Sequence, residues 1–210
     1  CLKIFMQGDR EFMLNFFQEL DYKIHEKYND IQISATILGG CFFVLHSLRE
    51  NSPDIDLLIN DSSSYRIISE IGIPLAKEKG ITLDLMYGNT LEKINLPDNY
   101  MRYVKPLKRE RNKRKHLKLW TLSPYHILIS KISRYSDKDK NDIKLIMNSG
   151  KFLIRRKELE RAVKNFKANE IKSIFEKNYN DFLQKYEKKL VLSWWEKLGL
   201  HKPIPELKDS

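Results

Sequence analysis

The spacing of hydrophobic and polar residues predicts strands alternating with helices in the first part of the chain. Over 11–28, apolar residues recur every three or four positions, which predicts a helix with one buried face. Over 31–38, apolar and polar residues alternate, as they do in a strand whose two faces have different surroundings. The same criteria predict further strands at 54–59, 81–87 and 117–122, and further helices at 41–48, at 65–79 and from Pro124 onward.

After Gly150 the hydrophobic spacing is wholly helical, with helices predicted at 155–166, 169–185 and 187–198. Strands and helices in alternation, followed by helices alone, predict two domains. We expect an α/β (α+β) domain over 1–150, with a mixed sheet flanked by helices. We expect it to be followed by a C-terminal helical bundle domain over 151–210.

Composition indicates a folded protein with an affinity for polyanions. Of its 210 residues, 41% are hydrophobic and 31% are charged, a balance that disordered chains lack. Lysine and arginine number 38 against 28 acidic residues, and the net charge of +10 favours phosphate-rich partners, because each phosphate contact releases condensed counterions. The alternative is a lysine-rich surface without a nucleic-acid role, since net charge alone does not distinguish the two.

Cysteine content and hydropathy exclude several other classes of protein. The sequence has two cysteines, Cys1 and Cys41, so cysteine can build neither a disulfide framework nor a four-cysteine zinc site. No apolar run approaches the roughly 18 residues that span a bilayer, and residues 1–10 lack the pattern of a signal peptide. We therefore expect a cytoplasmic protein with no membrane partner.

The first candidate for chemistry is a pair of carboxylates that follows a pair of glycines. Gly39-Gly40 ends the strand predicted at 31–38, and after residues 41–53 the next strand begins with Asp54-Ile55-Asp56. Because residues two apart in a strand face the same side, both carboxylates project together. Such like charges are unfavourable unless a cation binds them, and Mg²⁺ or Mn²⁺ prefers oxygen ligands of this kind. The pattern predicts a divalent-metal site at the two aspartates.

Two further features extend this site. Gly39 and Gly40 have no side chains, so the backbone can approach a triphosphate, and the following helix offers unpaired N–H groups and the positive end of its dipole. Asp84 lies on the outward face of the strand predicted at 81–87 and would reach the aspartate pair if the two strands are neighbours. Three carboxylates can hold two metal ions, one at an attacking hydroxyl and one at the leaving phosphate. We expect all three aspartates to be catalytic.

These two segments resemble the signature of the polymerase-beta-type nucleotidyltransferase fold, and in particular the AbiEii-like toxins of type IV toxin–antitoxin systems. The residues that carry the resemblance are Gly39, Gly40, Arg49, Ser52, Asp54 and Asp56. A second match lies farther along the chain, where Lys131 and Arg134 precede the aspartate-rich series at 137–143. Together the two motifs lie within residues 30–150, so the resemblance implies this fold for the first domain.

The resemblance also implies a role for each matching residue. It implies a metal bound by Asp54 and Asp56. It implies that Lys131 contacts the nucleotide phosphates and that Asp142 supports the site. The whole set of nucleotide-binding residues expected on this basis is Gly39, Gly40, Arg49, Ser52, Lys131 and Asp142. The hydrophobic spacing agrees for Lys131, which lies at the edge of an apolar helix face where its ammonium can reach a cleft.

The segment 102–118 is strongly basic, with nine lysines and arginines against one acid, Glu110. Charge of this density is not buried in a core, so we expect an exposed loop or hairpin that binds a polynucleotide backbone. The residues expected to contact RNA are Arg109, Arg111, Arg114 and Lys115. A solvated loop without a ligand is the alternative.

The function expected from these features is metal-dependent transfer of a nucleotide from a nucleoside triphosphate to an acceptor hydroxyl. We expect the acceptor to be an RNA such as tRNA, and the protein to be a toxin with an antitoxin protein as partner. Two alternatives stay open: a phosphotransferase that uses the same site, and a noncatalytic RNA- or partner-binding module that keeps the fold. Two departures from the family pattern favour the noncatalytic alternative. Cys41 stands where these relatives usually have a small hydroxyl residue, and Ser136 stands where many have an arginine.

Overall fold

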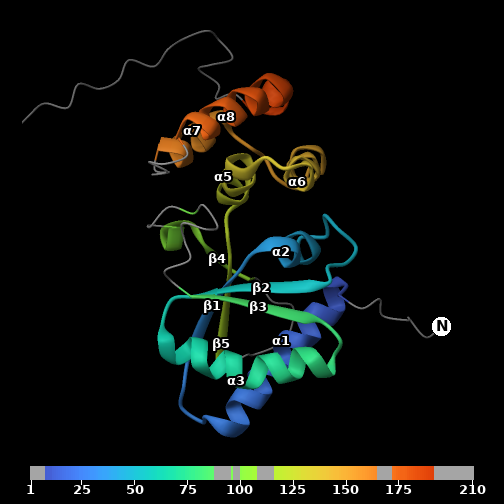
Figure 1. The fold of residues 1–210 in the computed structure, drawn as a ribbon, viewed down its shortest axis with the longest axis vertical. Coiled ribbons are helices and arrows are strands. Elements are labelled where there is room, and N and C mark those ends of the chain that lie inside the picture. The colour runs from blue at the N-terminus through green and yellow to red at the C-terminus, as the bar shows by residue number, and fades with distance from the viewer. Residues whose placement is uncertain (1–7, 88–95, 97–99, 108–115, 165–171, 192–210) are drawn as a thin grey trace, which may run out of the picture. The chain divides into compact units, whose positions relative to one another are not determined.

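The computed structural model describes residues 8–87, 96, 100–107, 116–164 and 172–191. The chain forms two compact units, Cys1–His126 and Ile127–Ser210, which we call the first and second unit. Figure 1 colours the first unit from blue to green and the second from yellow to red. The domain boundary at 150 stays a prediction from sequence, since compactness alone does not define a functional domain.

The first unit contains a mixed sheet of five strands in the order β3-β2-β1-β5-β4 (Figure 1). The strands are β1 (Ile33–Ile37), β2 (Asp54–Ile59), β3 (Thr82–Tyr87), β4 (Lys105–Pro106) and β5 (Leu117–Thr121). β2 and β3 are parallel, as are β1 and β5, whereas β1–β2 and β4–β5 are antiparallel. The mixed sheet and α/β class predicted from the sequence are confirmed, with β4 as an unpredicted edge strand.

Three α-helices flank this sheet in the part of the first unit that the structure describes. They are α1 (Arg10–Lys27), α2 (Gly39–Leu45) and α3 (Ser62–Glu78), and a 3₁₀ turn, η2, spans Tyr100–Tyr103. Figure 1 shows α1 and α3 on one side of the sheet and α2 on the other. Each long helix begins at an aspartate cap: Asp9 accepts a hydrogen bond from the Phe12 N–H (2.8 Å), and Asp61 accepts one from Ser64 (2.7 Å).

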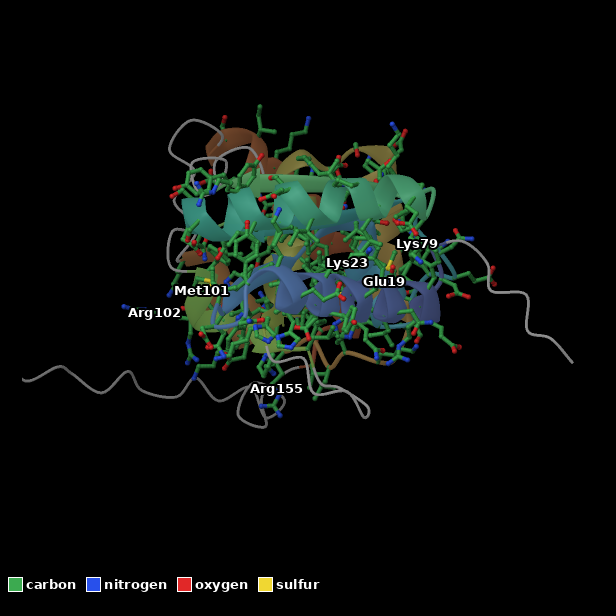
Figure 2. The ribbon with its side chains drawn as sticks, turned by 90° about the horizontal axis from the view of Figure 1, so that it is seen from below. Glu19, Lys23, Lys79, Met101, Arg102 and Arg155 are labelled. Atoms are coloured by element: carbon green, nitrogen blue, oxygen red, sulfur yellow. The ribbon has the colours of Figure 1, made fainter. Side chains whose placement is uncertain are left out.

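The helices α1 and α3 lie side by side, and Figure 2 views this face with Glu19 and Lys23 of α1 labelled. Lys79, just beyond α3, forms an ion pair with Glu19 (2.8 Å) that links the two helices. Gly72 allows α3 to approach the sheet, because a β-carbon there would lie 2.8 Å from Leu83 Cδ2. The helix continues through Pro74 without a break.

The two faces of the sheet differ in character because side chains alternate along each strand. Ile33 and Ile37 of β1 and Ile55 and Leu57 of β2 are fully buried in the main hydrophobic core, together with residues of α1 and α3. The alternate positions of β2 and β3 include Asp54, Asp56 and Asp84. The core residues contributed by α1 and α3 therefore pack on one face of the sheet, and the three aspartates lie on the other, the side of α2 (Figure 1).

The described residues of the second unit are mostly helical, with an isolated bridge between Arg155 and Val191. Its helices are α5 (Pro124–Arg134, which begins in the first unit), α6 (Asp137–Asn148), α7 (Arg156–Lys164) and α8 (Lys172–Tyr186). Asn178 of α8 donates a hydrogen bond to the carbonyl of Ile132 in α5 (3.0 Å). A separate C-terminal bundle domain stays a prediction. No helix within the described ranges is long and apolar enough to span a membrane.

The helix predicted at 187–198 is wrong over its described part. Residues Glu187–Lys189 form a 3₁₀ turn, and Leu190 is extended at φ −74° and ψ 127°. Val191 then donates to the carbonyl of Ile154 (2.9 Å) and accepts from the N–H of Arg156 (3.2 Å). These bonds to another segment replace the i to i−4 bonds of a helix.

Candidate metal centre

The candidate site begins with the pairing of β2 and β3. These neighbouring parallel strands place Asp56 opposite Asp84 and Asp54 opposite Thr82. Carboxylate oxygens of Asp54, Asp56 and Asp84 all lie within 4.8 Å of one another. The structure thus brings together the three aspartates that the sequence places on two separate strands.

This donor set has the chemistry of a divalent-metal site. Asp54 and Asp56 are half-buried and Asp84 is exposed, so the charges are only partly screened by solvent. Three like charges at this separation repel unless a cation lies among them, and hard oxygen ligands suit Mg²⁺ or Mn²⁺. The residues therefore fit a magnesium or manganese ion.

Gly39 and Gly40 pack directly against the aspartates. Gly39 has a φ of +53°, and a β-carbon there would lie 1.6 Å from Oδ2 of Asp56. A β-carbon on Gly40 would lie 2.1 Å from the Ser52 hydroxyl oxygen and 3.1 Å from Oδ1 of Asp54. The turn is fixed there because the N–H of Leu38 donates to the carbonyl of Asp56 (3.0 Å). Any side chain at either glycine would collide with the carboxylates or with the serine beside them.

Ser52 and Arg49, both on the segment that leads into β2, occupy different places. The Ser52 hydroxyl is buried and donates to Oδ1 of Asp54 (2.6 Å). The Arg49 guanidinium lies 5.2 Å from the centre of the Phe43 ring. Arg49 also lines an open cavity of about 680 Å³ together with Arg10, and none of the three aspartates lines this cavity. Ser52 thus belongs to the aspartate cluster by direct contact, and Arg49 belongs to a neighbouring surface.

Cys41, the residue after the glycine pair, is a buried thiol. Burial raises its pKa well above the ordinary value, and the nearby charges of Asp56 and Asp54 raise it further. The sulfur is therefore protonated at neutral pH. The buried thiol form is a weak nucleophile, because the reactive species is the thiolate.

Lys131 and Asp142 lie in the second unit, where they form part of a buried ionic network. The Lys131 ammonium is 2.7 Å from Asp142 and 3.1 Å from Asp139, and Arg134 is 2.9 Å from Asp139. Burial alone would raise the pKa of Asp139. Hydrogen bonds from Arg134 and Ser136, and the positive charges of Lys131 and Arg134, lower that pKa below its ordinary value.

Asp139 was not among the candidate residues predicted from the sequence, although its spacing from Asp142 indicates a shared position. It lies three residues before Asp142, so helical spacing places both on one face of α6. The structure buries both carboxylates against the same ammonium. Contact of Lys131 with a nucleotide stays a prediction.

The basic residues predicted to bind RNA, namely Arg109, Arg111, Arg114 and Lys115, lie outside the described residues. The strands that flank them in sequence are described. β4 and β5 pair antiparallel, with Lys105 opposite Thr121, and the N–H of Leu107 donates to the carbonyl of Leu119 (2.9 Å). The flanking chain is thus anchored to the edge of the sheet, and the RNA-binding role stays a prediction.

A mixed sheet with three carboxylates on adjacent strands, beside a glycine turn, defines an α/β protein of nucleotidyltransferase-like architecture. The chain belongs to the family described as nucleotidyltransferase of unknown function (DUF6036), whose family model matches residues 13–191. Comparison with curated proteins and with solved structures gave no match. Membership supports the nucleotidyltransferase superfamily expected from the glycines and aspartates, but it does not extend to the AbiEii-like toxins.

Proposed function

We propose that this protein is a metal-dependent nucleotidyltransferase that transfers a nucleotide from a nucleoside triphosphate to an acceptor hydroxyl. The observation that carries the proposal is the convergence of Asp54, Asp56 and Asp84 within 4.8 Å, against a glycine turn without side chains. Family membership over residues 13–191 supports the same class of enzyme.

In this proposal the residues of the site have separate roles. Asp54 and Asp56 hold Mg²⁺ or Mn²⁺, and a bound ion supplies positive charge that polarises the α-phosphate and screens the pyrophosphate. The backbone of Gly39 and Gly40 approaches the phosphates, because no side chain intervenes. Asp84, the exposed member of the cluster, accepts the proton of the attacking hydroxyl.

The reaction is a displacement at phosphorus. The acceptor oxygen forms a bond to the α-phosphorus, the bond from that phosphorus to the bridging oxygen breaks, and pyrophosphate leaves with the bonding electrons. The hydroxyl proton passes to Asp84 and then to solvent. Catalysis on this scheme consists of positioning and electrostatic stabilisation, as in other phosphoryl-group transfers.

For the acceptor we propose RNA such as tRNA, bound by Arg109, Arg111, Arg114 and Lys115. The net charge of +10 and the nine basic residues of 102–118 support a polyanionic acceptor. On the resemblance to AbiEii-like toxins we also propose a cytoplasmic role as the toxin of a toxin–antitoxin pair. Its partner would then be an antitoxin protein.

For the nucleotide we propose that Lys131 contributes a positive charge to the phosphates, with Asp142 holding its ammonium. The 2.7 Å contact between them supports this role, since a fixed ammonium is a better point charge than a mobile one. Arg49 is a further proposed phosphate contact, whereas Ser52 acts through its hydrogen bond to Asp54.

Labelled nucleotides test the proposal directly. Purified protein is incubated with Mg²⁺, total RNA and each nucleoside triphosphate labelled at the α- or the γ-phosphate, alongside Asp54→Asn and Asp56→Asn. Nucleotidyl transfer predicts α-label on RNA from the wild type and none from either variant. Transfer of γ-label alone would make the protein a phosphotransferase. Transfer of neither label, with RNA binding retained, would make it a noncatalytic module.

A further inference from the structure

We propose that Ser52 is a positioning residue of the metal centre, whose buried hydroxyl orients the Asp54 carboxylate, and that Gly8 holds Ser52 in place. This inference rests on the proposed function, because orientation of the carboxylate matters where a cation binds to it. It assigns Ser52 an action through Asp54 instead of contact with the nucleotide.

The Ser52 side chain is buried, and its hydroxyl is hydrogen-bonded to Asp54. The residue is 2% exposed, and Oγ donates to Oδ1 of Asp54 at 2.6 Å, a short distance for a hydroxyl-to-carboxylate bond. The same oxygen lies where a side chain on Gly40 would begin, since a β-carbon there would be 2.1 Å away. The hydroxyl is thus buried from solvent and already bonded to Asp54.

Gly8 fixes the backbone of Ser52 from a distant part of the sequence. The Ser52 N–H donates to the Gly8 carbonyl (3.0 Å), and Asp9 pairs with Asn51 in an antiparallel bridge. Gly8 has a φ of +79°, and a β-carbon there would lie 2.0 Å from the Ser52 carbonyl oxygen. Glycine is therefore required at this contact both by backbone conformation and by space.

The bond matters because of the charge around it. Asp54 lies within 4.8 Å of two other carboxylates, and their repulsion favours rotation of its side chain away from the cluster. A hydroxyl that donates to one carboxylate oxygen opposes this rotation. Groups that hydrogen-bond to a metal ligand in this way change metal affinity by roughly 10–100-fold when they are removed.

Calorimetric titration of the full chain with Mn²⁺ tests the role. Ser52→Ala is expected to bind Mn²⁺ roughly 10-fold more weakly than the wild type. Ser63→Ala is the matched control, because Ser63 likewise donates to an aspartate two residues away in sequence (Asp61, 2.7 Å) but lies on the surface outside the cluster. It is expected to bind Mn²⁺ with wild-type affinity.

Ser52→Cys and Gly8→Ala provide independent checks. Cysteine has the same shape and a slightly larger volume but is a weak donor, so Ser52→Cys is expected to weaken Mn²⁺ binding even if Ser52→Ala fails to fold. Gly8→Ala displaces Ser52, so its effect on Mn²⁺ affinity is expected not to add to that of Ser52→Ala. Thermal unfolding without metal shows which variants are folded.

The outcomes distinguish failure of the positioning role of Ser52 from failure of the proposed function. Wild-type Mn²⁺ affinity in folded Ser52→Ala or Ser52→Cys would overturn the positioning role. If Asp54→Asn still abolished binding in the same experiment, the proposed function would stand. A wild-type protein that bound no Mn²⁺ would overturn both.

Discussion

Asp56 on β2 lies directly opposite Asp84 on the parallel strand β3, so two carboxylates project side by side from neighbouring strands. Asp54, two residues before Asp56, brings a third within 4.8 Å. A protein that keeps three negative charges this close is stabilised by any cation that binds among them. We therefore expect divalent metal to stabilise the fold.

Mg²⁺ is expected to raise the melting temperature of the wild type, and Asp56→Asn is expected to remove this rise. At a concentration about 100 times Kd, a ligand that binds only the folded state stabilises it by about 2.7 kcal/mol. For a chain of this size that corresponds to roughly 5–10 °C in Tm. Thermal unfolding with Mg²⁺ and with chelator measures the difference. An equal Mg²⁺-dependent rise in both proteins would show that the cluster is not the binding site.

Gly39→Ala is expected to abolish the Mg²⁺-dependent rise in Tm as well as lower stability. Alanine at φ +53° is strained by about 1–2 kcal/mol, and its methyl group would displace the Asp56 carboxylate from a position 1.6 Å away. Gly150→Ala separates the two effects, because Gly150 has a φ of +67° but a β-carbon there meets nothing within 4 Å. It should lose similar stability in chelator and keep the full response to Mg²⁺. Loss of the response in both variants would point to general destabilisation.

The strand that carries Asp54 and Asp56 could be located from sequence because both of its ends are marked. Turn-forming residues precede and follow it, and β2 has the predicted bounds, Asp54–Ile59. The adjacency of Asp84 could not be predicted in the same way. Which strands become neighbours depends on packing between distant segments, so the sequence supports only the condition that β2 and β3 adjoin. The order β3-β2-β1-β5-β4 meets that condition.

Other features were missed where local signals are weak or misleading. β4 contains only Lys105–Pro106, which is too short to show alternation. Tyr135 ends α5 at a φ of +50°, a conformation that is uncommon for a bulky residue and that nothing in its type predicts. Ser136 then caps α6 through the N–H of Asp139. The ionic network follows from this break, because it turns Asp139 and Asp142 back toward Lys131.

Lys131→Ala is expected to lower the free energy of unfolding by roughly 3 kcal/mol at pH 7, because it removes the ammonium beside two buried carboxylates. Lys140→Ala, which removes an exposed ion pair with Asp137, is expected to change it by less than about 1 kcal/mol. Denaturant unfolding measures both. A change in Lys131→Ala no larger than in Lys140→Ala would contradict a structural role for the network.

The nucleotide role of Lys131 needs a separate variant, since Lys131→Ala changes stability too. Lys131→Arg keeps a positive charge near Asp142 but replaces the compact ammonium with a planar guanidinium. We expect it to retain most of the stability and to bind nucleoside triphosphate more weakly. Calorimetric titration with nucleotide and Mg²⁺ gives the affinity. Unaltered nucleotide affinity in a folded Lys131→Arg would leave the residue with its structural role alone.

Replacement of Arg109, Arg111, Arg114 and Lys115 by serine is expected to flatten the salt dependence of RNA binding. Each lost phosphate contact reduces the slope of log K against log salt by roughly 0.7–0.9. Nucleotide affinity should not change, because the metal and phosphate contacts use other residues. The matched control has the same loss of charge at exposed positions elsewhere, namely Arg66, Lys77, Lys138 and Lys157. Equal slopes in the two variants would show that the basic segment has no special role.

His126 is expected to make the fold less stable in mild acid. The ring is 1% exposed, stacks on Tyr103 at 4.5 Å and lies 2.7 Å from the Ser123 hydroxyl through Nδ1. Nε2 has no hydrogen-bond partner among the described residues. Burial lowers the pKa of His126 from 6.5 to about 4, so between these values the unfolded chain takes up a proton that the folded protein does not.

The free energy of unfolding that His126 contributes therefore falls as pH decreases from about 6.5 to about 4 and is constant below that range. At about 1.4 kcal/mol per pKa unit, the loss between pH 7 and pH 4 is roughly 3 kcal/mol. Carboxylates also titrate here, so the measurement is the difference between the wild type and His126→Asn, whose side chain does not ionise. Urea unfolding at pH 7, 6, 5 and 4 should show the wild type losing stability faster than the variant. Parallel curves would mean that His126 is readily protonated in the folded state, and that the ring is in contact with water.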